Sequence, residues 1–144
     1  MKKLAQLVLA ATLGISAGYA SADAISDAAM SDVRTAEAKA RDEYRNPQQT
    51  LRFFGLQPNM TVVEVSPGGG WYTAILAPYL KNNGQLIAAH FPADSEVGFF
   101  QKSRAAFNKR FLLQPEIYGN IYVTELAPPQ KLPIAQAGEA DRVL

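Results

Sequence analysis

An acidic residue followed closely by three consecutive glycines is the part of this sequence best suited to chemistry. Glu64 lies within the largely apolar run 62–65, and the glycines are Gly68, Gly69 and Gly70. An apolar run, a glycine turn and a further apolar stretch with helical spacing indicate a strand, a tight turn and a helix. Because glycine has no Cβ, such a backbone can approach a nucleotide-like ligand closely. The segment therefore predicts a cofactor loop, the alternatives being an ordinary turn and a strand-end acid.

Two familiar glycine loops fit this segment poorly. A phosphate-binding Walker loop ends in Gly-Lys-Ser/Thr, whereas Gly70 is followed by Trp71 and Tyr72. A dinucleotide loop has the pattern G-x-G-x-x-G, whose last glycine lets the helix pack tightly on the strand. Here the corresponding stretch begins with Ser66 and has Trp71 at the last position.

A third pattern fits better. The run 64–70 resembles the acidic-x-Gly-x-Gly-x-Gly loop of class I S-adenosylmethionine-dependent methyltransferases, with Ser66 in place of the first glycine. The resemblance implies that the methionine part of the cofactor lies over the loop. Backbone N–H groups at the start of the next helix would favour its carboxylate. Glu64 would offset the positive ammonium and sulfonium groups.

Further segments strengthen this resemblance because they occur in one order. They are 41–47, 50–56, 67–73 and 88–91, and together they resemble a bacterial family of predicted, often exported, class I methyltransferases. The resemblance covers roughly residues 30–144. It implies S-adenosylmethionine as cofactor and methyl transfer to a small-molecule or unknown acceptor, largely by positioning the nucleophile in line with the methyl group.

Two other functions remain open. A non-catalytic binding module, or a truncated pseudoenzyme, would keep the strand, loop and helix for folding or for another adenosine-like ligand. A nicotinamide enzyme would bind that dinucleotide instead.

The remaining candidate contacts are aromatic, histidine and acidic side chains. Trp71 and Tyr72 are expected either to line the cofactor pocket or to lie in the core. His90, the only histidine, lies at the end of the second strand, where class I methyltransferases usually carry an acid for the ribose hydroxyls. Either ring nitrogen of His90 suits a hydroxyl, and a structural role is the alternative. Glu125 follows the third strand, where the resemblance implies an acid near the adenine and the alternative is a solvated loop glutamate. With one histidine and no cysteine we expect no metal site.

The elements that position these residues follow from periodicity and from helix-end signals. Asn46 is suited to cap a helix that begins at Pro47, with Gln49 as the partner in a capping box and Gly55 at the end. Strands are expected at 61–66, 85–91, 121–126 and 141–144, and helices at 26–45, 47–54, 70–80 and 95–113. This alternation predicts an α/β fold with βαβ units, about four parallel strands and helices on both faces. The resemblance makes it the N-terminal part of a Rossmann-like methyltransferase fold, preceded by N-terminal helices.

Three regions are expected along the chain. Residues 1–22 form a signal peptide, 23–57 a helical segment, and 58–144 the Rossmann-like domain, truncated at strand four. The charged stretch 41–45 is expected to act as a lid over the cofactor or to form a surface charge cluster. A parallel sheet that ends at strand four has an apolar edge, for which we expect a covering partner.

Composition limits the number of domains and the classes of partner. The chain has 144 residues, enough for one domain. Without the signal peptide it holds 12 basic and 13 acidic residues, a net charge of −1, and such a balance gives no basic face for nucleic acid. Cysteine is absent, which excludes disulfides and cysteine nucleophiles.

The first 22 residues read as a cleavable export signal. Lys2 and Lys3 precede an apolar stretch over 4–20, and Ala20-Ser21-Ala22 is a small-x-small cleavage site. The alternative is an uncleaved membrane anchor, but a spanning helix needs about 20 apolar residues. We expect a periplasmic or secreted protein with no stable membrane span after cleavage.

Cleavage of this signal can be tested directly. Mass spectrometry of the protein recovered from an exporting bacterial host should show an N-terminus at Asp23, because the cleavage site ends at Ala22. An intact Met1 would contradict the prediction.

Overall fold

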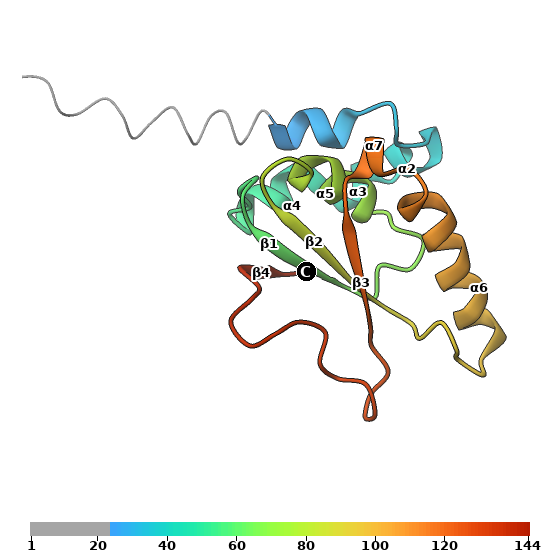
Figure 1. Cartoon of the computed structure of the whole chain (residues 1–144). Coiled ribbons are helices and arrows are strands. Elements are labelled where there is room, and N and C mark those ends of the chain that lie inside the picture. Colours follow the sequence, from blue (N-terminus) through green and yellow to red (C-terminus); the bar gives the residue numbers. More distant parts are fainter. Residues whose placement is uncertain (1–23) are drawn as a thin grey trace, which may run out of the picture.

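The computed structural model describes residues 24–144 and is built on a parallel four-stranded sheet (Figure 1). The strands are β1 (Thr61–Val65), β2 (Gln85–His90), β3 (Ile121–Glu125) and β4 (Arg142–Val143), in the order β3-β2-β1-β4. Every neighbouring pair is parallel, as predicted. The chain adds β2 and β3 on one side of β1 and then crosses back to add β4 on the other side, so the strand order reverses at β1. In open α/β sheets, ligands bind at the carboxyl ends of the strands beside such a switch point.

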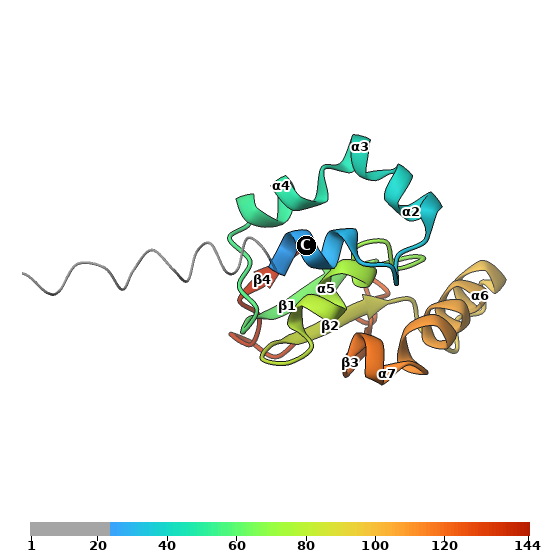
Figure 2. The same ribbon diagram turned by 90° about the horizontal axis from the view of Figure 1, so that it is seen from above.

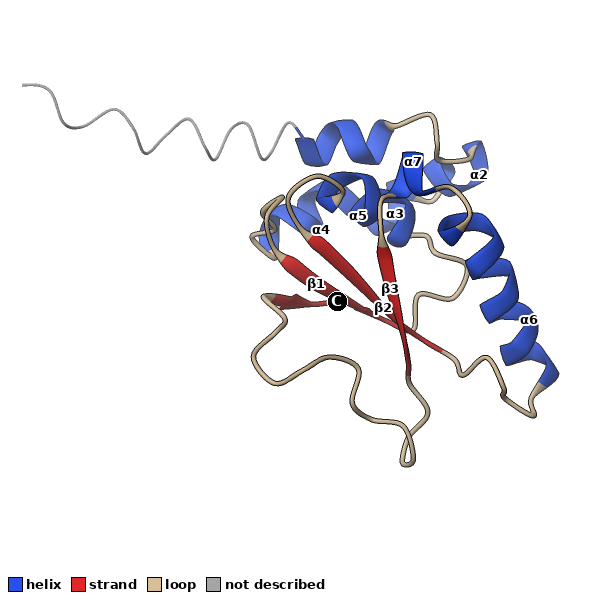
Figure 3. Cartoon of the chain, viewed as in Figure 1, coloured by secondary structure: helices blue, strands red, loops and turns tan. Residues whose placement is uncertain are grey.

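The helices pack against one face of the sheet (Figures 2 and 3). After a helix over 24–30 come α2 (Ala36–Ala40), α3 (Asp42–Arg45), α4 (Pro47–Phe53), α5 (Thr73–Leu80), α6 (Gly98–Phe107), the π-helix η1 (Asn108–Leu112) and α7 (Pro115–Tyr118). Val62, Leu86 and Ala88 point toward these helices and share one core with them. The residues before β1 therefore belong to the same hydrophobic core as the sheet.

A loop covers the opposite face of the sheet. Val63, Ile87 and Ala89 contact Leu126 and a partly buried group from the β3–β4 connection: Ile134, Ala135 and Ala140. The prediction of helices on both faces is therefore wrong for the described residues. The physical reason lies in the connection 127–140, which contains three prolines; each lacks an N–H donor and obstructs the preceding helical turn.

The predicted continuous helix over 26–45 is also wrong, since the chain turns between residues 31 and 35. Arg34 explains the turn. Its buried guanidinium donates to both carboxylate oxygens of Asp42, at 2.7 and 2.6 Å, and to the carbonyls of Ala29 and Ala38. Thr35 then caps α2 by accepting a hydrogen bond from the Ala38 N–H. A straight helix would separate these groups.

The next helix, α4, begins at Pro47 and ends before Gly55, as predicted. Gly55 has φ 64°, its N–H donates to Arg52, and the following N–H of Leu56 donates to Leu51, the pattern of a Schellman motif. Asn46, however, makes no side-chain capping bond and adopts a left-handed conformation. The predicted capping box is therefore not formed.

No helix within residues 24–144 combines the length and apolar character needed to cross a bilayer.

Candidate functional site

The glycine loop turns the chain from β1 into α5 through left-handed backbone conformations. Ser66, Gly68 and Gly70 have φ values of 53°, 57° and 76°. Ser66 thus adopts a conformation that favours glycine, at the position where the methyltransferase pattern has its first glycine. The Ser66 N–H is held by the carbonyl of Ala89, at 2.9 Å, so the loop begins from a fixed point on the neighbouring strand.

His90 supports this loop from beneath. Its Nδ1 accepts from the Phe91 N–H at 2.7 Å, and its Nε2 lies 3.1 Å from the Gly68 carbonyl. Nε2 therefore carries the proton of a neutral ring. Burial lowers the pKa of His90, and Arg104 adds to that effect, against the opposing effect of the bond to Gly68. Both ring nitrogens are bonded to backbone groups, so His90 supports the loop in this structure.

Phe111 fixes the far end of the loop. A Cβ added to Gly70 would lie 2.1 and 2.4 Å from two atoms of the Phe111 ring, so only glycine fits there. The adjacent Arg110 donates from Nη1 to the Gly69 carbonyl at 3.0 Å. The π-helix η1 therefore contacts the loop through both a ring and a cation.

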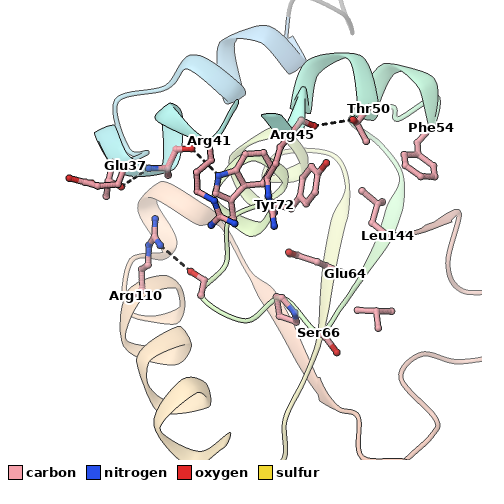
Figure 4. Close-up of a pocket in the computed structure, with 16 residues that line it drawn as sticks. Glu37, Arg41, Arg45, Thr50, Phe54, Glu64, Ser66, Tyr72, Arg110 and Leu144 are labelled. Atoms are coloured by element: carbon pink, nitrogen blue, oxygen red, sulfur yellow. Dashed lines mark hydrogen bonds between the residues drawn. The ribbon is translucent and has the colours of Figure 1, made fainter. Parts of the chain in front are cut away.

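A cavity of about 630 Å³ lies over the loop and beneath the N-terminal helices (Figure 4). This volume is in the usual range for small-molecule sites. The cavity brings together five of the predicted site residues: Glu64, Ser66, Gly69, Trp71 and Tyr72. Its lining does not include the other four, which are Gly68, Gly70, His90 and Glu125.

Glu64 lies at the floor of this cavity with its side chain turned inward (Figure 4). The residue is 5% exposed, and Oε2 accepts a 2.6 Å hydrogen bond from the Thr73 hydroxyl. Burial raises the pKa of Glu64 to about 7, although hydrogen bonds from Thr73 oppose the shift. A carboxyl group poised between its two protonation states near neutral pH therefore faces the space above the loop.

Trp71 joins the loop to the helices above it. Its Nε1 donates to the Ala38 carbonyl at 2.9 Å. The guanidinium carbons of Arg34 and Arg45 lie 5.2 and 4.7 Å from its ring centroid, within the range of cation–π attraction. This side chain is therefore both a wall of the cavity and the contact that holds α2 and α3 over it.

Glu125 does not line the cavity, and its carboxylate bonds to neighbouring loops. Its Oε1 accepts from the Ala93 N–H at 3.1 Å, and its Oε2 pairs with Lys131. The hydrogen bond from Lys131 lowers the pKa of Glu125. The carboxylate thus ties together the loops that follow β2 and β3.

Sequence reasoning missed Thr73 and Arg110. Thr73 has a usable signal, because the first turn of a helix after a glycine loop lies beside the preceding strand. Arg110 has none, because its place depends on the packing of η1. Within residues 24–144 no three His, Asp or Glu side chains gather as a metal site would require.

Comparison with protein-family models, curated proteins and solved structures gives no match for this chain.

Alanine substitutions in the loop should separate backbone strain from steric clash. Gly69→Ala should change the free energy of unfolding by less than about 0.5 kcal/mol, because a Cβ there meets open space. Gly68→Ala should cost about 1 kcal/mol through its positive φ alone. Gly70→Ala should cost about 3 kcal/mol or more, because it adds overpacking against Phe111. Urea denaturation measures all three. A cost for Gly70→Ala no greater than that for Gly69→Ala would contradict the packing described above.

Burial of Glu64 should make stability depend on pH. The folded carboxyl binds its proton more tightly than the unfolded one, so stability is greatest below pH 4.5 and falls as pH rises through about 7. The shift corresponds to about 3 kcal/mol. Glu64→Gln should remove this part of the pH dependence, while Glu43→Gln, at an exposed position, should retain it. Urea denaturation between pH 4.5 and 8 makes the comparison, and parallel wild-type and Glu64→Gln profiles would refute the prediction.

Proposed function

We propose that the cavity binds S-adenosylmethionine and that the chain is a class I methyltransferase domain acting on a separate acceptor. The observation that carries this proposal is the juxtaposition of a left-handed glycine loop and a buried acid at the switch point of a parallel sheet. A backbone without side chains at the carboxyl end of β1 suits close approach by an adenosine-like ligand. A nearby acid suits a cofactor that carries positive charge.

We assign the cofactor contacts to the five predicted residues that line the cavity. Glu64 would offset the ammonium and sulfonium charges, and the backbone of Ser66 and Gly69 would lie against the methionine part. The positive end of the α5 dipole would favour the carboxylate. Trp71 and Tyr72 would form an aromatic wall that excludes water. The bound cofactor would supply an activated methyl group.

A second candidate is a binding module without turnover, and the state of His90 favours it. In the methyltransferase pattern this position carries an acid that holds the ribose, whereas both ring nitrogens of His90 bond to backbone groups. We therefore assign neither His90 nor Glu125 to the adenosine part. We also propose export to the periplasm or medium, on the signal predicted at 1–22, which lies outside the described residues.

Titration calorimetry with S-adenosylmethionine and S-adenosylhomocysteine tests the proposal. A cationic ligand above Glu64 should favour its ionised form, so binding at pH 7 should release about half a proton. Repeating the titration in buffers of different ionisation enthalpy measures that release. Glu64→Gln should abolish the proton release and weaken binding about tenfold.

The control ligand is a nicotinamide dinucleotide, which should give no heat. Absence of binding by both cofactor forms to protein that is folded by circular dichroism would reject the proposal. Binding without transfer of a labelled methyl group to any acceptor in a small-molecule extract would favour the binding module.

A further inference from the structure

Three arginines line the cavity, and among residues 24–144 no carboxylate forms an ion pair with them. They are Arg41, Arg45 and Arg110. Across residues 24–144 none of the ion pairs involves these three side chains. Arg34 provides the contrast, because its buried guanidinium is paired with Asp42. Guanidinium groups that line a cavity without an acidic partner leave donors free for a ligand.

Other groups hold two of these cations in place. Arg45 lies over the ring of Trp71 at 4.7 Å, and Arg110 lies over the ring of Phe111 at 4.8 Å. Arg110 uses one donor on the Gly69 carbonyl, and a guanidinium has five. Arg41 makes no side-chain hydrogen bond among the described residues and lies on the rim. Rings and a carbonyl oxygen orient these groups without cancelling their charge.

The two acids of the cavity do not offset the arginines fully. Glu37 is engaged at the start of its own helix, where its backbone N–H and the Thr35 hydroxyl lower the pKa of its carboxyl group. Glu64 lies at the floor, bonded to Thr73. In Figure 4 Arg41, Arg110 and Glu37 lie on one side of the cavity, while Glu64, Phe54 and Leu144 lie on the other. The first side therefore keeps a net positive charge, and the second is acidic and more apolar.

We propose that the cationic side binds an anionic second ligand, one with a carboxylate or phosphate group, and that this ligand is the methyl acceptor. The identification as acceptor rests on the proposed function. Arginine is suited to this task because its planar donors match both groups in a bidentate manner. The arginines come from the N-terminal helices and from η1, so the anion would be held between these two parts of the fold.

Trp71 supplies the readout, because it is the only tryptophan and lines the cavity beside Arg45. Pyrophosphate and succinate should each be titrated at constant ionic strength, with sodium chloride as the blank. The two probes distinguish phosphate from carboxylate. At least one should change the Trp71 emission saturably. Arg41→Gln should weaken that binding at least tenfold, whereas Lys102→Gln, which removes an exposed cation outside the cavity lining, should leave it unchanged.

Parallel titrations with S-adenosylhomocysteine separate this inference from the proposed function. Anion binding that Arg41→Gln weakens while S-adenosylhomocysteine binding is unchanged supports the anion site. Equal weakening of both ligands would mean that the arginines hold the cofactor's own carboxylate, and would overturn the inference.

The remaining outcomes are equally decisive. Cofactor binding without saturable anion binding, or an equal effect of Lys102→Gln, would overturn the anion site alone. Anion binding with no cofactor binding would uphold the site and reject the proposed function.

Discussion

The packing of the Phe111 ring against the backbone of Gly70 is the constraint on which the site depends. The ring occupies the space that a Cβ would need, so the loop and η1 are in direct contact. Phe107 continues this packing, since its ring lies 4.8 Å from that of Phe111 and 5.0 Å from that of His90. His90 in turn bonds to the loop at Gly68. These contacts fix the loop at two points, Gly68 and Gly70. The position of Phe111 also brings the adjacent Arg110 to the edge of the cavity.

Local signals were sufficient to predict the strands, the loop and the parallel sheet. Each strand is a short apolar run bounded by turn residues, and the loop contains its glycines in one block, so neither needs a distant partner to be recognised. Which elements cover each face of the sheet was harder to predict. Helices were expected on both, but the prolines at 128, 129 and 133 keep the β3–β4 connection from forming one. The break in the N-terminal helix at residues 31–35 could not be predicted for another reason. Arg34 resembles an exposed helical charge until Asp42 is seen to fold back onto it.

The same division holds within the site. The position of Glu64 in the cavity was predictable because it lies near the end of the strand that leads into the glycines. The roles of His90 and Glu125 were not, because a polar side chain at a strand end can face a ligand or a neighbouring loop. Their bonding partners decide between these: Gly68 for His90 and Ala93 for Glu125 are remote in sequence, while Lys131, the second partner of Glu125, is near it. The local sequence therefore does not distinguish a polar residue that stabilises the fold from one that contacts a ligand.

The distribution of charge in the cavity is the remaining physical constraint on its ligand. A buried acid and uncompensated arginines can share one cavity because burial of the acid favours its protonated form, while Arg41 and Arg45 are exposed to solvent. An anionic group at the floor would be repelled by ionised Glu64, and a cationic group at the rim would be repelled by the guanidinium groups. The pyrophosphate of a dinucleotide lies on the glycine loop itself, beside the acid. The proposed cofactor, with positive charge over the loop, and the proposed anion at the rim would together complement both sides.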